Sequence, residues 1–361
     1  MGLPQNSGIE LYSKWPKGER NLITDVEGVT VGHVTLQDGD INTGVTAILP
    51  HQGNLFQDKV MAGVSVINGF GKSAGIVQIQ ELGTIETPII MTNTLSVGTA
   101  VTALVKYMLA QNEDIGVSTG TVNALVTECN DGRLNDIRGL HVTEDMVLEA
   151  LRSTDVTFEE GAVGSGTGMC CLGVKGGIGS ASRKVASDGK DYTIGALVMS
   201  NFGADDNLTV GGKHIGKKIS EQVAKDKAAR EAEAAEAAEK KDQGSIIILL
   251  ATDIPLNERQ LTRVAKRAAI ALGRTGSYLG NGSGDIAIAF TTANRLSHYS
   301  EKNVLETKMF YDENIDIVFE PAVEAVEEAV ISSLYHARTT KGIRGNLVRS
   351  LKEYIENGIL D

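Results

Sequence analysis

The residue whose position most clearly suggests a reactive group is Ser245. It follows Gly244 at the point where a long polar segment is succeeded by an apolar one. Residues 246–252 (IIILLAT) are predicted to form a buried strand, so Ser245 would stand at its start. If the Gly244–Ser245 bond were cut, Ser245 would carry a free α-amine. Such an amine has a pKa of about 7.7–8.0 and can act as base for the serine's own hydroxyl. The alternative is an ordinary Gly-Ser turn, which the local sequence by itself favours.

Signatures of other chemistries are absent from the sequence. No Gly-x-Ser-x-Gly elbow is followed by a convincing acid and histidine, so a conventional serine triad is not supported. Gly71-Lys72-Ser73 resembles the end of a phosphate-binding loop, but Val66 stands where that loop requires a glycine. The six histidines are dispersed, without HExxH or Cys-x-x-Cys spacing, so we expect no metal and no cofactor. Cys170 and Cys171 are predicted to be core residues.

Alternating strand and helix patterns would have to position Ser245. Runs of β-branched and apolar residues predict strands, and apolar residues three and four positions apart predict helices. Their pairing along the chain indicates sheets covered by helices. The predicted strands are 29–31, 34–36, 45–49, 64–67, 88–91, 194–199, 246–252 and 286–290. The predicted helices are 101–109, 321–335 and one that is opened by Asp253 and Pro255 and stopped by Gly273.

Two glycine-rich stretches are predicted to be turns. Residues 161–183 contain eight glycines, of which those at 164, 166 and 168 indicate a tight structural turn. Residues 281–285 (NGSGD) are predicted to form a turn before the strand 286–290.

The segment 217–241 differs from the rest of the chain in composition, because it consists almost entirely of Ala, Glu, Lys, Asp and Gln. Opposite charges four residues apart, such as Glu221 and Lys225, would support an exposed helix. Only Ile219 and Val223 could form an apolar stripe. We therefore predict a solvated helix or a mobile connector outside the core.

Composition limits the classes of partner. The 361 residues carry a formal charge of −12, which argues against nucleic acid or an anionic membrane as the main partner. No stretch approaches the roughly 20 apolar residues of a membrane helix, and no signal-peptide apolar region precedes residue 21. Three cysteines make no disulfide framework, so a cytoplasmic location is expected.

Taken together, the motifs resemble a family of self-cleaving aminopeptidases. This family contains the L-aminopeptidase/D-amidase-esterase of the DmpA type and the β-peptidyl aminopeptidases. The resemblance runs over nearly the whole chain and rests on motifs that occur in the family's order. They include residues 23–26 with 31–34, 81–83, 86–88, 92–98, 128–131, 134–137, 161–183, 200–203, 244–247, 251–253, 274–276 and 282–285.

The resemblance implies an α+β fold, a four-layer αββα sandwich similar to the N-terminal nucleophile hydrolases. It also implies a single catalytic domain, residues 1–361, that cuts itself into an α chain 1–244 and a β chain 245–361. The charged segment 217–243 would then be an exposed tail of the α chain. A homo-oligomer, a tetramer of αβ units, is expected.

The family's site residues carry over to positions of this chain. Ser245 would attack the scissile carbonyl, and Asn201 would stabilise the oxyanion. Ser283 and Asp285 would orient the Ser245 amine and hydroxyl, although many relatives have Glu in place of this Asp. Glu128 matches the carboxylate that receives the substrate's free amino group. The alternatives are an ion pair of Glu128 with Arg133 or Arg138, and a simple turn at Asn201.

The implied substrates are small peptides or amino-acid amides with a free amino group, whose L-, D- or β-amino configuration the sequence leaves open. Two other functions were weighed. One is an acyltransferase similar to ornithine acetyltransferase, whose nucleophile is Thr, and which Ser245 and the Glu128 motif therefore disfavour. The other is an uncleaved, non-catalytic protein that binds small amines on the same scaffold.

Overall fold

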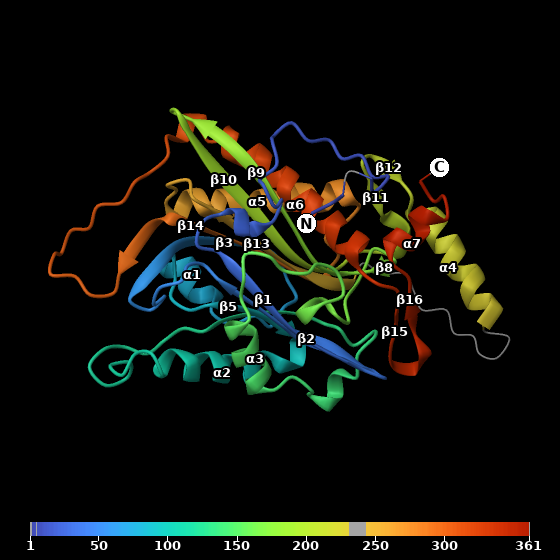
Figure 1. The fold of residues 1–361 in the computed structure, drawn as a ribbon, viewed down its shortest axis with the longest axis horizontal. Coiled ribbons are helices and arrows are strands. Elements are labelled where there is room, and N and C mark those ends of the chain that lie inside the picture. The colour runs from blue at the N-terminus through green and yellow to red at the C-terminus, as the bar shows by residue number, and fades with distance from the viewer. Residues whose placement is uncertain (1, 5, 231–242, 361) are drawn as a thin grey trace.

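The computed structural model describes the whole chain except residues 1, 5, 231–242 and 361. Two sheets lie face to face, and helices cover the outer face of each (Figure 1). On one side are α5 (Glu258–Thr275) and α6 (Asp316–His336), and on the other are α2 (Val97–Leu109) and α3 (Glu144–Arg152). The arrangement is the αββα sandwich that the sequence resemblance implied.

The larger sheet has six strands in the order β4-β3-β14-β13-β10-β9. Its central pair, β13 and β14, is parallel, and α5 supplies the crossover that a parallel connection needs. All other neighbours are antiparallel. The strands are β3 (Asp58–Gly69), β4 (Thr84–Ile85), β9 (Gly177–Ser187), β10 (Lys190–Asn201), β13 (Gln243–Thr252) and β14 (Gly282–Ser297).

The smaller sheet has the order β1-β2-β5-β6, with β5 and β6 parallel and joined through α2. Its strands are β1 (Thr30–Asp38), β2 (Ile41–Leu49), β5 (Ile89–Asn93) and β6 (Leu125–Cys129). The remaining short elements are α1 (Ile76–Leu82), α4 (Gly216–Arg230), α7 (Leu351–Glu356), β7 (Cys170–Cys171), β8 (Val174–Lys175), β11 (Thr209–Val210), β12 (Lys213–His214), β15 (Thr340–Lys341) and β16 (Leu347–Val348).

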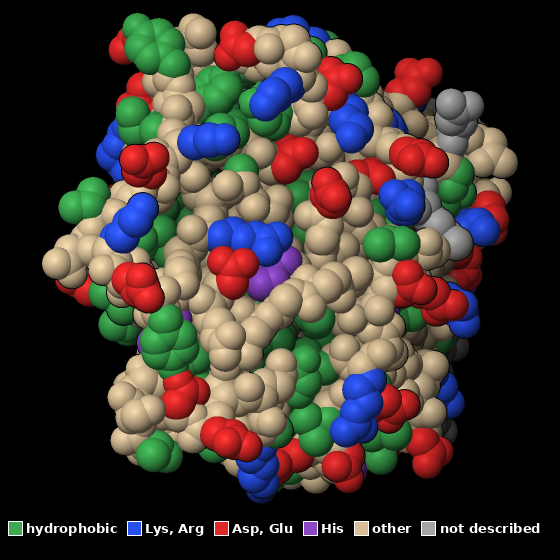
Figure 2. Space-filling view, turned by 60° about the vertical axis from the view of Figure 1, so that its left-hand side comes forward, with side chains coloured by type: hydrophobic (Ala, Val, Ile, Leu, Met, Phe, Trp, Pro, Cys, Tyr) green, Lys and Arg blue, Asp and Glu red, His purple; other side chains and the backbone are tan. Residues whose placement is uncertain are grey.

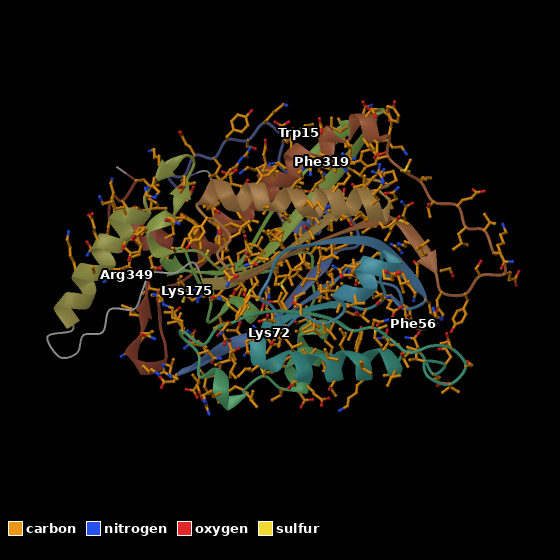
Figure 3. All side chains as sticks on the ribbon, turned by 180° about the vertical axis from the view of Figure 1, so that it is seen from behind. Trp15, Phe56, Lys72, Lys175, Phe319 and Arg349 are labelled. Carbon is orange, nitrogen blue, oxygen red and sulfur yellow. The ribbon has the colours of Figure 1, made fainter. Side chains whose placement is uncertain are left out.

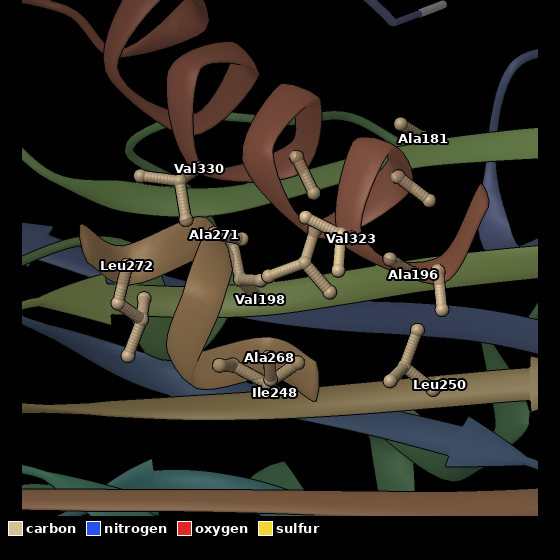
Figure 4. Packing of buried hydrophobic residues seen from close by; sticks show 14 of the residues in the cluster. Ala181, Ala196, Val198, Ile248, Leu250, Ala268, Ala271, Leu272, Val323 and Val330 are labelled. Atoms are coloured by element: carbon tan, nitrogen blue, oxygen red, sulfur yellow. The ribbon is translucent and has the colours of Figure 1, made fainter. Parts of the chain in front are cut away.

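Strand β13 is apolar from Ile246 to Ala251 because both of its faces are buried there. Ile248 and Leu250 face α5 and α6, where they pack with residues such as Ala268 and Val323 (Figure 4). The alternate residues, such as Leu249, face the core between the sheets. This double burial explains the continuous apolar run in the sequence.

Several predicted elements have different limits in the structure. Residues 30–36 belong to one strand, β1, and not to two, because Gly32 lies inside it; Val29 precedes the strand. A Cβ at Gly32 would come within 2.4 Å of the Ala150 carbonyl oxygen, so this glycine allows α3 to approach. Strand β9 was not predicted at all, since its first residues belong to the glycine-rich stretch. The tight turn at Gly164–Gly166 is present as a 3-10 turn.

Helix α5 starts and ends later than predicted. It begins at Glu258 behind the N-cap Asn257, which accepts a hydrogen bond from the Gln260 amide and makes a capping box with it. The helix continues through Gly273 and ends at Thr275, and the C-cap Gly276 that follows has a φ of 109°, which glycine adopts readily. Strand β14 was also predicted too short: residues 282–285 belong to the strand and are not a turn.

The charged segment begins as helix α4, in which Ile219 is buried, Val223 is half-buried and the other side chains from 217 to 225 are largely exposed. The rest of the predicted connector, residues 231–242, lies outside the described residues. On the molecular face shown in Figure 2, acidic and basic side chains are interspersed. Within the described part of the chain, no helix combines the length and apolarity that crossing a membrane would require.

Candidate active site

Three neighbouring strands bring the predicted site residues of the larger sheet together. Ser245 on β13 is paired with Asn201 on β10 and with Gly284 on β14. Gly244 is paired with Ser283 in the same parallel ladder. Ser245 is 5% exposed, so its hydroxyl lies inside the protein but close to the surface. Residues from distant parts of the sequence therefore meet through strand register alone.

The peptide bond before Ser245 has an unusual geometry. The Ser245 hydroxyl donates a hydrogen bond of 2.6 Å to the carbonyl oxygen of Gly244, so the side chain lies against its own preceding peptide group. Gly244 has a φ of 139°, and a Cβ there would be 2.0 Å from the Asn201 carbonyl oxygen. Only glycine fits this position.

Ser283 and Asp285 form a buried pair next to this bond. The Ser283 hydroxyl donates to Asp285 Oδ1 at 2.6 Å, and both residues are 1% exposed. Because side chains alternate along a strand, this pair leaves β14 on the face opposite to Gly284. Gly284 itself faces Ser245, whose Oγ would be 3.0 Å from a Cβ there. The register pairs Ser283 with Gly244 and Asp285 with Ile246, so the backbone positions of the pair flank that of Ser245 on the neighbouring strand.

Asn201 is the last residue of β10, and both the oxygen and the nitrogen of its side-chain amide are hydrogen-bonded. Its Oδ1 accepts a hydrogen bond from the Cys170 amide, and its Nδ2 donates to the Asn130 carbonyl oxygen, each at 2.9 Å. An amide nitrogen carries two hydrogens, so the second N–H of Asn201 is a donor that could serve a bound ligand. Asn201 thus belongs to a strand and not to the turn that was the alternative.

A buried lysine fixes the loop that carries Cys170. Lys175 is fully buried, and its Nζ donates to three backbone carbonyl oxygens, those of Gly166, Met169 and Gly176, at 3.0, 2.7 and 2.7 Å. Burial lowers the pKa of Lys175 to about 8. The lysine closes the glycine-rich loop around itself and so holds the amide that orients Asn201. Lys175 was not predicted from the sequence, where the only signal for it is a cation inside a run of small and apolar residues.

Glu128 approaches from the other sheet. It lies on β6, is 2% exposed, and accepts hydrogen bonds from the Lys72 amide at 2.8 Å and from the Thr94 hydroxyl. The alternative ion pairs with arginine do not form in the described structure: Arg133 lies 3.9 Å from Asp205 instead. Among the described residues, no cationic side chain lies within ion-pair distance of Glu128. A buried carboxylate of this kind is suited to receive a cation from a ligand.

Two glycines separate Glu128 from Ser245. A Cβ on Gly71 would lie 3.5 Å from Glu128 Oε1 and 3.9 Å from the Gly284 Cα. A Cβ on Gly284 would in turn lie 3.0 Å from Ser245 Oγ. The carboxylate and the hydroxyl therefore face each other across small residues. The residues that support Glu128, Lys72 and Thr94, were not predicted, although both lie in stretches that the sequence analysis discussed.

The cysteines do not compete with Ser245 as nucleophiles. Burial raises the pKa of the Cys129 thiol well above its usual value, and it also raises that of Cys170. Cys171 is buried in the core, as predicted. No group of three or more His, Cys, Asp or Glu side chains that could hold a metal ion occurs among the described residues.

These features define the class of protein: an α+β sandwich with a serine at the start of a central strand, which is the Ntn hydrolase fold in its DmpA variant. The model of Peptidase family S58 matches residues 21–348, and the chain belongs to this family. The family resemblance drawn from the sequence motifs is thereby confirmed.

The curated relatives support the same assignment. The chain is 38% identical over 345 residues to the β-peptidyl aminopeptidase BapA of Sphingosinicella microcystinivorans, covering 92% of this chain and 86% of that protein. It is 36% identical over 336 residues to BapA of Sphingosinicella xenopeptidilytica, covering 90% and 83%. The chain is thus an S58-family aminopeptidase or amidase.

Solved structures agree with the fold. A Pyrococcus horikoshii OT3 protein is 52% identical, with a TM-score of 0.89 and coverage of 98% of this chain and 97% of that one. A Burkholderia sp. β-aminopeptidase is 36% identical, with a TM-score of 0.85 and coverage of 98% and 97%. The L-aminopeptidase D-Ala-esterase/amidase of Ochrobactrum anthropi is 36% identical, with a TM-score of 0.86 and coverage of 98% and 96%. The last is described as a variant of the Ntn hydrolase fold.

Proposed function

We propose that this protein cuts itself before Ser245 and then removes N-terminal amino acids from short peptides, amides or esters through an acyl-enzyme on Ser245. The observation that carries the proposal is the 2.6 Å contact between the Ser245 hydroxyl and the Gly244 carbonyl oxygen. This contact supports the proposal because the Ser245 hydroxyl lies against the preceding peptide group, and Asn201 and the Ser283–Asp285 pair are on the adjacent strands.

The cleavage is an N→O acyl shift followed by hydrolysis. The Ser245 oxygen attacks the Gly244 carbonyl carbon, the C–N bond breaks, and the nitrogen of Ser245 takes up the proton that the hydroxyl has lost. The resulting ester between Gly244 and Ser245 is hydrolysed by water. The products are a carboxylate on Gly244 and a free Ser245 with both an α-amine and a hydroxyl. The domain 1–361 thus becomes an α chain 1–244, ending in the charged tail 217–243, and a β chain 245–361.

In turnover, the freed α-amine takes the hydroxyl proton while the oxygen attacks the substrate carbonyl. Ser283 and Asp285 hold and polarise that amine; the support for this role is that the register pairs them with Gly244 and Ile246, the residues on either side of Ser245. The uncommitted N–H of Asn201 donates to the oxyanion. The leaving amine departs with a proton, and water then releases the acyl group. Glu128 holds the substrate's ammonium group, so a blocked N-terminus would leave a buried carboxylate without a cation.

The proposal also concerns where the substrate carries its amino group, on the α or the β carbon. β-Amino acids are the first substrates to test, because both curated relatives are named β-peptidyl aminopeptidases. A panel of L-, D- and β-homo-amino-acid p-nitroanilides, each with an N-acetylated control, measures the preference. If the enzyme cleaves only the compounds with a free amine and not the acetylated controls, the role of Glu128 is supported. Equal turnover of the acetylated controls contradicts it.

We also propose a homo-oligomer, a tetramer of αβ units. Residues 299–309 project from the body between β14 and α6 (Figure 1) and expose apolar side chains, among them Val304 at 78% and Met309 at 60%. Such surface is typical of a contact with another chain. Light scattering coupled to gel filtration should give four αβ units, and a mass of one unit would contradict this.

The central test compares Ser245→Ala with Ser118→Ala, a matched change in an exposed loop. Denaturing electrophoresis of the wild type and of Ser118→Ala should show two chains and undiminished turnover. Ser245→Ala should remain a single chain of 38.3 kDa without turnover. A Ser245→Ala protein that is still cut, or that retains activity, overturns the proposal. Acyl transfer to an amino-acid acceptor without hydrolysis would favour the acetyltransferase-like alternative, and tight amine binding by an uncut wild type would favour the binding protein.

A further inference from the structure

The loop formed by residues 69–73, here called the Phe70 loop, connects the two halves of the site. At one end the Lys72 amide donates to Glu128 Oε1 at 2.8 Å. At the other end the Phe70 amide donates to the Ser283 carbonyl oxygen at 3.3 Å, and the Phe70 carbonyl oxygen would be 2.6 Å from a Cβ on Gly284. The loop thus passes beside both Glu128 and the strand next to Ser245.

The Phe70 and Lys72 side chains of this loop are exposed to solvent, whereas the Ser73 hydroxyl is buried. Phe70 is 60% exposed, and the Lys72 ammonium lies 4.2 Å from the centroid of its ring. This cation–π contact holds the ammonium above the aromatic face at the edge of the site. Figure 3 labels Lys72 on the side of the molecule seen there.

The ammonium of Lys72 is available for a ligand. Within the described part of the chain, some lysines make ion pairs with carboxylates, whereas Lys72, like several other lysines, has no carboxylate within that distance. The paired lysines are Lys14, Lys17, Lys59, Lys106 and Lys352. The exposed Lys72 ammonium adds a positive charge at the edge of a site that contains the carboxyl groups of Glu128 and Asp285, in a chain of net charge −12. The positive charge of Lys72 would offset the repulsion between these carboxyl groups and an anionic group on the substrate.

The lengths of the groups fit a dipeptide. An extended chain of two residues spans at most about 7 Å. The lysine side chain reaches roughly 6 Å from its backbone, and the Lys72 backbone itself contacts Glu128. A dipeptide with its ammonium at Glu128 therefore ends within the sweep of the Lys72 ammonium. An added third residue would carry the carboxylate past it.

We propose that Lys72, steadied by Phe70, binds the C-terminal carboxylate of dipeptide substrates whose amino group is bound by Glu128. The favoured substrate class is then the free dipeptide over its C-terminal amide and over longer peptides. This inference rests on the proposed aminopeptidase function and deepens it, because it assigns a specificity-determining residue for the leaving group.

The test uses the pair Xaa-Gly and Xaa-Gly-amide, where Xaa is the residue that the p-nitroanilide panel selects. The wild type should favour the free acid in kcat/KM. Lys72→Gln should reduce the ratio of acid to amide by up to about fivefold, the upper end of the range of an exposed ion pair, mainly through the KM of the acid. Lys72→Arg should largely retain the ratio, and Phe70→Leu should lower it less than Lys72→Gln does.

The control is Lys106→Gln, which removes an exposed lysine of α2 far from the site in sequence and leaves the same net charge as Lys72→Gln. It should leave the ratio unchanged. Raising the salt concentration should reduce the wild-type ratio, because an exposed ion pair is screened. A wild-type ratio near one, or an unchanged ratio in Lys72→Gln, overturns the inference. If p-nitroanilides are still cleaved in a Ser245-dependent way, the proposed function survives that result. If no free-amine substrate is cleaved, the proposed function itself fails.

Discussion

The two sheets contribute to the site in different ways. The six-stranded sheet supplies Ser245, Asn201 and the Ser283–Asp285 pair from three adjacent strands, whose positions are fixed by hydrogen-bonded register. The four-stranded sheet supplies only Glu128 from a strand, and its partners Lys72 and Thr94 lie outside the strands. The proposed reacting groups are thus all held by strands, whereas the recognition group Glu128 is on a strand but depends on partners outside the strands.

This difference has a physical basis. A one-residue slip in a strand moves every side chain to the opposite face, so the groups of the larger sheet must keep one register. Loops tolerate changes in sequence and conformation much better. Changes on the larger sheet should therefore act on cleavage and kcat, and changes around Glu128 should act on which substrates are accepted.

The largest effect is expected for Gly244→Ala. Its Cβ would overlap the Asn201 carbonyl oxygen, at 2.0 Å, and its φ of 139° disfavours any residue but glycine. Self-cleavage should slow at least about 100-fold, as followed by densitometry of the two chains, since a small misplacement of reacting groups can have such an effect. Gly273→Ala is the matched control, because its Cβ would meet nothing within 4 Å. A normally processed Gly244→Ala protein would show that register does not fix the cleavage geometry.

Asn201→Ala should have the next largest effect. Losing an oxyanion donor lowers kcat roughly 100- to 1000-fold, with a smaller change in KM. Steady-state kinetics on fully processed protein measures this, and mass spectrometry confirms the processing. A decrease in kcat below about fivefold would remove Asn201 from the mechanism.

Glu128→Gln sharpens the comparison from the other sheet. Hydrogen bonds to charged groups contribute about 1.5–3 kcal/mol, so kcat/KM for free-amine substrates should fall roughly 10- to 150-fold. The advantage over N-acetylated substrates should shrink by the same factor, and self-cleavage should continue. If Glu128→Gln instead blocks self-cleavage and leaves amine selectivity intact, the assignment of roles to the two sheets is wrong.

The sequence was informative where burial leaves a simple pattern. Strand β13 has both faces buried, so its apolar run was unmistakable and placed Ser245 at its start. The layered αββα fold followed from the family resemblance, and both are confirmed. The limits of α5 were wrong because capping by Asn257 and packing of Gly276 against Asn207 decide them. These tertiary contacts are not written in local periodicity.

The site was predictable only as a set of separate residues. Ser283 and Asp285 were placed in a turn because their glycines suggested one, whereas pairing with β13 draws them into a strand. Lys175 gave no usable signal, since a buried lysine that binds only backbone carbonyl oxygens depends on the path of its loop. Lys72 was equally hidden, because its partner Glu128 is 56 residues away in sequence.

The smallest effect is expected away from both halves of the site, at His33 on β1. Its Nδ1 lies 2.9 Å from the Thr46 hydroxyl, its Nε2 lies 3.1 Å from the Glu159 carbonyl oxygen, and burial lowers its pKa to about 4. Between pH 6.5 and about 4, His33 binds a proton in the unfolded chain but not in the folded chain. The free energy of unfolding should therefore fall as the pH falls through this window. Urea titrations should show a shallower loss in His33→Gln. An equal pH dependence in both proteins would exclude His33 as its source.

The account is tested most directly by the intact mass of active protein purified without protease exposure. We predict two polypeptides, one ending at Gly244 and the other beginning at Ser245 with a free amine, and both absent from Ser245→Ala. Full activity in a sample that contains only the uncut chain of 38.3 kDa would contradict the account.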